Sequence, residues 1–231
     1  MKLEKVTERS EGMTKRWYDD ACGTALAMEL VGERWSLLIV RELMFGPRRF
    51  GELRGGLPGI SANVLTQRLE GMERVGILAR RKLPPPASVQ VYELTALGYS
   101  AEVAIQELGR WAAQSPLHDA TLPFSAASAM LSFRTMIDRS RSSAFGATVG
   151  FRFGNEVFFA VVDAGGIAIR RGDPAEAAVM FETDPATLAS VVYGGRPIAD
   201  AEVAGTLRIA GDRALAERFV TLFPLPAKLG S

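Results

Sequence analysis

The stretch that most constrains the fold runs from Ser61 to Thr95, where a helical pattern is followed by two strand patterns. The two expected strands, about 77–83 and 88–94, flank three consecutive prolines at 84–86. Because proline has no backbone N–H, these three residues cannot pair in a ladder and must form the tip of a hairpin. The sequence therefore predicts a helix that leads directly into a two-stranded antiparallel hairpin.

The expected helix at 61–75 has marked ends and one apolar face. Ser61 is a favoured N-cap residue, and Gly76 is typical of the position that follows a helix. The side chains expected on the buried face are apolar and lie at helical spacing: Leu65, Leu69 and Met72, with Val64 beside them. A short helical segment, RRFGELRGGL, precedes this helix and ends at the turn Pro58–Gly59–Ile60.

A helix, a turn, a second helix and a two-stranded wing form the arrangement that presents one helix to the major groove of DNA. We therefore interpret the 61–75 helix as a recognition helix. Its candidate base-contacting side chains are short or carry an amide: Ser61, Asn63, Thr66 and Gln67. Arg68, near the same turn, is expected to reach guanine or a phosphate. The alternative is the polar face of an ordinary surface helix.

Basic residues flank the expected recognition helix on both sides. Arg80, Arg81 and Lys82 lie on the first wing strand, and we expect them to contact phosphates or the minor groove. The alternative is that they only make an exposed hairpin soluble. Arg48 and Arg49 begin the short preceding helix and are candidates for anchoring the DNA backbone.

The charge of the chain is unevenly distributed, although its formal net charge is only +1. The segment from Arg34 to Lys82 carries a net charge of +6, which leaves −5 on the rest of the chain. A basic patch confined to the helix-turn-helix and wing is the electrostatic pattern of a module that binds a polyanion.

Cys22 is the single cysteine, so the chain cannot form an internal disulfide framework, which fits a reducing cytoplasm. The start of the chain is charged throughout and no apolar run approaches 18 residues, so we expect a cytoplasmic protein without a signal peptide or membrane span. Cys22 lies near the start of a helix expected at 21–32, where the helix dipole can lower a thiol pKa. We favour a small buried hydrophobe here, with a redox-active thiol as the alternative.

Helices are also expected at 35–44 and from Thr95 to about residue 114. The latter is predicted as one long helix whose apolar surface exceeds what a winged-helix core needs, so a second subunit is expected to cover it. The chain changes character between Pro116 and Pro123, and the second half mixes helices and strands as an α+β domain does. The predicted organisation is a flexible N-terminus at 1–20, a DNA-binding and dimerisation domain at 21–115, a linker at 116–124 and a second domain at 125–226.

The second domain is rich in aromatic and aliphatic residues, which either line an apolar pocket or form a packed core. The candidates for a pocket that binds an effector are Phe151, Phe153, Phe159, Phe181, Val192 and Phe219.

Catalytic constellations are scarce in this chain. His118 is the only histidine, and no His/Cys cluster, GxGxxG motif or phosphate-binding loop is present. We therefore expect neither an enzyme nor a metal or other cofactor. The chief alternative to a gene regulator is a lipid or metabolite carrier without DNA-binding activity, whose first half serves only for dimerisation. A hydrolase or isomerase built on the second domain is a weaker rival.

Residues 20–114 resemble the HxlR family of winged-helix transcription regulators. The matching features occur in the family's order and spacing: Cys22, Gly32–Glu33–Arg34–Trp35, Gly46–Pro47–Arg48–Arg49–Phe50–Gly51–Glu52–Leu53, Pro58–Gly59–Ile60–Ser61, Leu65–Thr66–Gln67–Arg68–Leu69, Tyr92–Glu93–Leu94–Thr95 and Gly98. The resemblance implies a homodimer that binds a double-stranded DNA operator as a repressor or activator. Some family members sense oxidants through the early cysteine, although Gly23 stands here where the family usually has proline.

Residues from about 121 to 226 resemble sterol-carrier-protein-like domains, chiefly in VGFRFGNEVFFAVVDAGGIAIRRG and TLRIAGDRALAERFVTLFP. This resemblance implies an apolar pocket for a lipid or an aromatic metabolite. The combined prediction is an α+β chain with an N-terminal winged helix-turn-helix, a long dimerisation helix and a C-terminal sterol-carrier-like domain. Its expected function is a transcriptional repressor that responds to an apolar effector.

Overall fold

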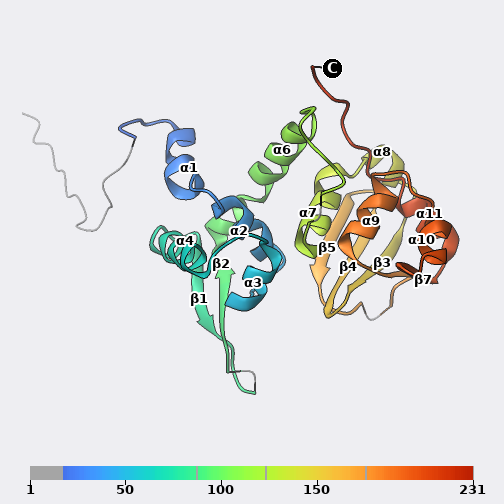
Figure 1. Ribbon diagram of the computed structural model, residues 1–231, viewed down its shortest axis with the longest axis horizontal. Coiled ribbons are helices and arrows are strands. Elements are labelled where there is room, and N and C mark those ends of the chain that lie inside the picture. The colour runs from blue at the N-terminus through green and yellow to red at the C-terminus, as the bar shows by residue number, and fades with distance from the viewer. Residues whose placement is uncertain (1–17, 87, 123, 175, 231) are drawn as a thin grey trace, which may run out of the picture.

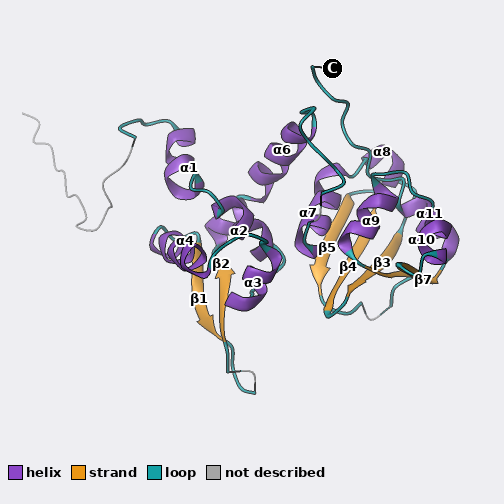
Figure 2. Ribbon diagram, in the orientation of Figure 1, coloured by secondary structure: helices purple, strands orange, loops and turns teal. Residues whose placement is uncertain are grey.

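The computed structural model describes residues 18–86, 88–122, 124–174 and 176–230 (Figure 1). The chain forms a two-stranded sheet near its N-terminal end and a five-stranded sheet nearer its C-terminal end, each with its own helices (Figure 2). The predicted flexible N-terminus lies mostly outside the described residues. Within the described ranges, no helix combines the length and the apolarity that crossing a membrane requires.

The first part of the chain contains the expected helices and hairpin. Its elements are α1 (Gly23–Val31), α2 (Ser36–Leu43), α3 (Phe50–Gly56), α4 (Ala62–Arg74), β1 (Leu78–Lys82), β2 (Gln90–Leu94), α5 (Ala96–Ser100) and α6 (Glu102–Ala113). Helices α2, α3 and α4 enclose a common core, so the predicted helix, turn, helix and wing are confirmed.

Local chemistry fixes both ends of α4 as predicted. The Ser61 hydroxyl accepts a hydrogen bond from the Val64 amide at 3.2 Å, which caps the helix start. Gly76 follows the helix at φ +75°, a conformation that favours glycine because it lacks a Cβ atom. Leu65, Leu69 and Met72 are buried against the other helices.

The wing is an antiparallel hairpin in which Leu78 lies opposite Leu94 and Lys82 opposite Gln90. The strands are slightly shorter than predicted, and a bond from the Leu83 amide to the Val89 carbonyl at 2.9 Å extends the pairing towards the tip.

The predicted long helix from Thr95 to residue 114 is wrong in one respect, because the chain breaks it at Ala101. The Thr95 hydroxyl donates to the Gly76 carbonyl at 2.6 Å, and a Cβ atom on Gly98 would lie 2.2 Å from the Ile77 carbonyl oxygen. These contacts hold α5 against the wing, whereas α6 packs on α2 and on α7 (Ala126–Met136). Contacts with the wing hold the first turns of the predicted helix, and contacts with α2 and α7 hold the rest, so the sequence forms two helices, α5 and α6.

The second part of the chain is an α+β unit around the five-stranded sheet. Its remaining elements are α8 (Arg139–Ser142), β3 (Ala147–Phe153), β4 (Glu156–Asp163), β5 (Gly166–Arg171), β6 (Val179–Thr183), α9 (Pro185–Val192), α10 (Ile198–Val203), β7 (Leu207–Gly211) and α11 (Arg213–Phe219). The strand order is β5-β4-β3-β6-β7, with β3 antiparallel to β4 and parallel to β6.

The helices gather on one face of this sheet (Figure 2). Alternate strand residues such as Val149, Phe151 and Phe181 point into that layer and are fully buried, as the two-residue period of a strand requires. Phe133 of α7 joins them and stacks on Phe223 with a ring-centroid distance of 4.4 Å. Helix α7 ends at Met136, since the chain turns at Ile137 before α8 begins.

Candidate nucleic-acid interface

The N-terminal half of α4 presents a continuous polar face to solvent. Ser61, Asn63, Thr66 and Gln67 are all exposed, while the opposite face of the helix is buried in the core. Helix α4 lies at an edge of the first part of the molecule, with the wing strand β1 directly below it (Figure 1). This geometry leaves hydroxyl and amide groups free to hydrogen-bond to base edges.

Arg68 differs from these neighbours because its guanidinium is already occupied. Its Nη2 atom lies 2.7 Å from the Glu33 carboxylate, and its Nε donates to the Arg34 carbonyl at 3.0 Å. These contacts tie α4 to the loop before α2. In this structure Arg68 therefore positions the helix, although we had expected it to contact DNA.

Two of the three basic residues on β1 form ion pairs, one with α4 and one with β2. Arg80 contacts Glu73 at 2.7 Å, and this side-chain hydrogen bond lowers the pKa of Glu73 and raises that of Arg80. Arg81 contacts Glu93 at 2.9 Å. Lys82 is exposed beyond them, towards the tip of the wing. The carboxylates neutralise part of the basic charge that the sequence placed on the wing.

Arg48 is not at a surface that DNA could reach, in contrast to its predicted role. Its side chain is only 6% exposed and contacts Glu42 at 3.3 Å and Glu156 at 3.0 Å. Its backbone also pairs with Tyr92 through two hydrogen bonds, 2.9 and 2.8 Å long. Arg49, the next residue, is exposed and caps α3, where its amide donates to Glu52 at 2.8 Å. Of the two arginines, only Arg49 keeps the predicted exposure.

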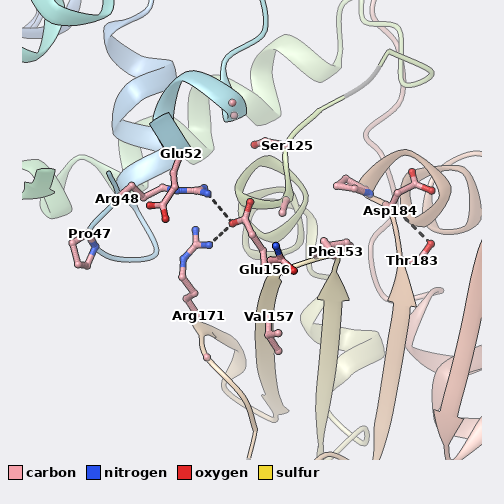
Figure 3. Close-up of a pocket in the computed structure, with 17 residues that line it drawn as sticks. Pro47, Arg48, Glu52, Ser125, Phe153, Glu156, Val157, Arg171, Thr183 and Asp184 are labelled. Carbon is pink, nitrogen blue, oxygen red and sulfur yellow. Dashed lines mark hydrogen bonds and ion pairs between the residues drawn. The ribbon is translucent and has the colours of Figure 1, made fainter. Parts of the chain in front are cut away.

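Figure 3 shows the ion cluster that holds Arg48 between the two parts of the chain. Glu156 at the start of β4 lies between Arg48 and Arg171, the last residue of β5, and ion-pairs with both. Glu42 of α2 is fully buried and accepts a hydrogen bond from the Ser125 hydroxyl at 2.5 Å. The cluster borders a cavity of about 780 Å³ that is lined by residues of both parts.

Burial and charge act in opposite directions on Glu156. Burial raises its pKa, but the hydrogen bond from Arg171 and the charges of Arg48 and Arg171 outweigh burial, so the pKa lies below its ordinary value. Sequence analysis did not identify Glu42, Glu156 or Arg171. An acid within the apolar run of α2 was the one available signal, because a buried carboxylate requires a partner.

Cys22 is exposed at the N-cap of α1, so our interpretation of it as a small buried hydrophobe is wrong. The backbone and side chain of Thr24, followed by the backbone of Ala25, lower the pKa of the Cys22 thiol. An exposed thiol with a lowered pKa is the more nucleophilic kind of cysteine.

The expected effector-pocket residues lie mainly in the core of the second part. Phe151, Phe181 and Phe219 are fully buried, and their ring centroids lie 5.5 to 5.7 Å apart. Phe159 and Val192 are half-buried, and Phe153 lines the cavity of Figure 3. The aromatic side chains that suggested a pocket thus fill space against one another.

Large apolar side chains remain exposed on α6 and on helices α1, α2 and α5. They include Leu26, Met28, Leu38, Leu97, Val103, Leu108 and Trp111. The Trp111 side chain is the largest of these, and the residue is 70% exposed. Exposed apolar residues gathered in this way mark a surface for protein association.

Comparison with known proteins agrees with the helix-turn-helix geometry. The profile of the HxlR-like helix-turn-helix family matches residues 30–119. The HTH-type transcriptional regulator YodB of Bacillus subtilis is 39% identical over 88 residues, which are 38% of this chain and 79% of YodB. An uncharacterized HTH-type transcriptional regulator of Mycobacterium bovis is 40% identical over 99 residues, which are 43% of this chain and 61% of that protein.

Solved structures of regulators are also similar to this chain. The reduced form of YodB from B. subtilis has a TM-score of 0.39 and 36% identity, and covers 42% of this chain and 98% of that one. The family match at residues 30–119 contains α4 and the wing. The chain therefore belongs to the HxlR-like helix-turn-helix family and is a DNA-binding transcriptional regulator of that type.

Proposed function

We propose that this regulator is a homodimeric repressor that reads its operator with the N-terminal half of α4. The observation that carries the proposal is the row of exposed hydroxyl and amide groups on that helix, from Ser61 to Gln67. Asn and Gln side chains pair naturally with adenine in the major groove. Arg49 and the wing residues Arg80, Arg81 and Lys82 then contact phosphates on either side, and Glu73 of α4 and Glu93 of β2 release Arg80 and Arg81 to do so.

Dimerisation is supported by the exposed apolar residues of α1 and α6, which a second copy would cover. Two copies related by a twofold axis would present their α4 helices to successive major grooves, about 34 Å apart on a pseudo-palindromic site. On this proposal residues 21–115 bind DNA and dimerise. Residues 125–226 help to bind an apolar effector, and residues 116–124 join the two.

The test compares DNA binding of two variants with the parent chain. Duplexes selected by the protein from a random-sequence pool serve as the operator, and scrambled duplexes serve as competitors. Gln67→Ala should reduce the preference for the selected duplex by about tenfold, as expected for one lost base contact, with little change on scrambled DNA. Arg81→Ala should weaken both and lower the log–log salt slope by about 0.9.

Asn155→Ala provides the matched control, because it removes an exposed amide from the turn between β3 and β4. Its DNA affinity should equal that of the parent. Equal, salt-independent affinity of the parent for every duplex would contradict the proposal. Tight binding of an apolar molecule by a chain without any DNA affinity would favour a lipid or metabolite carrier.

A further inference from the structure

A second cavity, of about 580 Å³, lies where the two parts of the chain meet. Helix α2 contributes Leu37, α6 contributes Ile105 and Ala112, and α7 contributes Leu131. The segment between α6 and α7 closes one side with residues such as Phe124. The volume falls in the range of cavities that enclose drug-sized ligands, and most of the lining is apolar.

The open space in this cavity extends to the backbone of α6. A Cβ atom placed on Gly109 would meet no atom within 4 Å. Ile105, Leu108 and Gly109 of α6 line the cavity, whereas Val103, two residues before Ile105, lies about 200° away around the helix. The cavity therefore adjoins the apolar surface that a second copy would cover and shares Leu108 of α6 with it.

Two hydroxyl groups that line the cavity direct their hydrogens at backbone carbonyls of their own helix. Ser132 donates to the Ala129 carbonyl at 2.8 Å, and Thr135 donates to the Leu131 carbonyl at 2.8 Å. The Tyr193 hydroxyl lies 2.8 Å from the Ser132 oxygen, and it is the donor in this pair when the single Ser132 hydrogen is directed at the Ala129 carbonyl. Burial raises the pKa of Tyr193, so this hydroxyl keeps its proton. Its oxygen retains lone pairs that can accept.

We propose that this cavity binds one neutral, apolar molecule that carries an O–H or N–H donor, such as a phenol or an alcohol. The apolar walls take up its body, and its donor bonds to the Tyr193 oxygen. A ligand that offers only acceptors finds no donor at this point and pays for desolvating its polar group. This inference rests on the proposed function, because it names the effector class and the site at which the effector would act.

Occupancy would be transmitted through the walls of the cavity. Helix α2 belongs to the DNA-binding core, and Arg68 ties the loop before it to α4. Helix α6 carries the surface proposed to pair with a second copy. A ligand wedged between α2, α6 and α7 changes how α6 sits on the core, and so the spacing of the two α4 helices. It can do this only by binding the two arrangements with different affinities.

The test uses 2-naphthol and 2-methoxynaphthalene, which share an apolar body and differ in the donor. Calorimetric titration of the full chain should give one 2-naphthol per chain, with 2-methoxynaphthalene bound at least about fivefold more weakly, the value of one net hydrogen bond. Tyr193→Phe should bring the two affinities together. Equal affinities in the parent chain, or no binding of 2-naphthol, would overturn the proposal.

Gly109→Leu fills the cavity from a position with free space, so the fold should tolerate it. It should abolish binding of both probes, whereas Ala214→Leu, at an exposed position of α11, should leave binding unchanged. Undiminished binding by Gly109→Leu would place the ligand elsewhere. Loss of the dimer in this variant, measured by light scattering, with no probe binding in the parent, would identify the cavity as a subunit interface.

DNA binding separates failure of this inference from failure of the proposed function. Saturating 2-naphthol should change the affinity of the parent for its selected duplex, but not that of Gly109→Leu. An unchanged affinity in the parent would refute the regulatory role of the site. Selective DNA binding without probe binding would refute the site and leave the repressor proposal standing. Specific probe binding by a chain that binds no DNA would refute the repressor proposal and leave the ligand site standing.

Discussion

Replacing Arg48 with methionine tests whether the buried ion cluster joins the two parts of the chain. Arg48 lies between Glu42 and Glu156, at 3.3 and 3.0 Å, and methionine keeps most of its volume without the charge. Removing one partner of a buried pair typically costs about 3–5 kcal/mol, because the remaining charge stays desolvated. Glu42 keeps Arg41 at 2.9 Å and the Ser125 hydroxyl, so we expect the lower end, about 3 kcal/mol.

Part of this loss of stability comes from the ion pair between Arg48 and Glu156, which joins the two parts of the chain. A double-mutant cycle with Glu156→Gln measures that part. The Glu156 side chain is 32% exposed and retains Arg171, so the coupling energy should be about 1 kcal/mol. Urea unfolding followed by tryptophan fluorescence reports the first part of the chain, which holds all three tryptophans. Far-UV circular dichroism reports both parts.

DNA affinity provides the contrasting measurement. Arg48→Met should leave the salt slope of DNA binding unchanged, whereas Arg49→Met should lower it by about 0.9. A destabilisation below about 0.5 kcal/mol, which is typical of a surface site, would refute the structural role of Arg48. A fall in salt slope equal to that of Arg49→Met would show that Arg48 contacts DNA after all.

Three further outcomes follow from the same structure. Phe133→Ala should destabilise the second part by about 4 kcal/mol, since the ring is fully buried among other aromatic rings; a loss below about 1 kcal/mol by circular dichroism would contradict this. Folding lowers the pKa of Glu156, so Glu156 stabilises the folded chain at any pH above the unfolded pKa of about 4.3. This contribution to the free energy of unfolding disappears as the pH falls through the folded pKa. Accordingly, the stability difference between parent and Glu156→Gln should shrink from pH 6 to pH 3, and a constant difference would speak against the ion pairs. Finally, Cys22 should react with iodoacetamide with an apparent pKa below that of an unfolded peptide of the same sequence, and an equal or higher value would remove the effect assigned to Thr24.

Features that depend on neighbouring residues were predictable from the sequence. Three boundaries each follow from a side chain and its adjacent backbone: the Ser61 cap, the Gly76 ending and the proline-rich wing tip. The structure places each of them within a few residues of the predicted position. The exposed face of α4 was equally predictable, because burying Leu65 and Leu69 forces Asn63 and Gln67 outwards.

Features that depend on partners far along the chain were not predictable in this way. A pattern of charges marks where arginines occur but not which carboxylates meet them, so Arg48 was expected on DNA and is instead held by a glutamate 108 positions later. The break at Ala101 likewise follows from competing contacts to the wing and to α7, not from its own sequence.

The sequence by itself determined most of the elements, their order and the polar face of α4, because helical and strand periodicities are short-range properties of the chain. Only the tertiary structure decided which aromatic side chains fill the core of the second part and where its contact with α2 and α6 leaves space. Whether an apolar side chain packs or lines a cavity depends on the shapes of the surfaces brought together, and those surfaces come from residues distant in sequence.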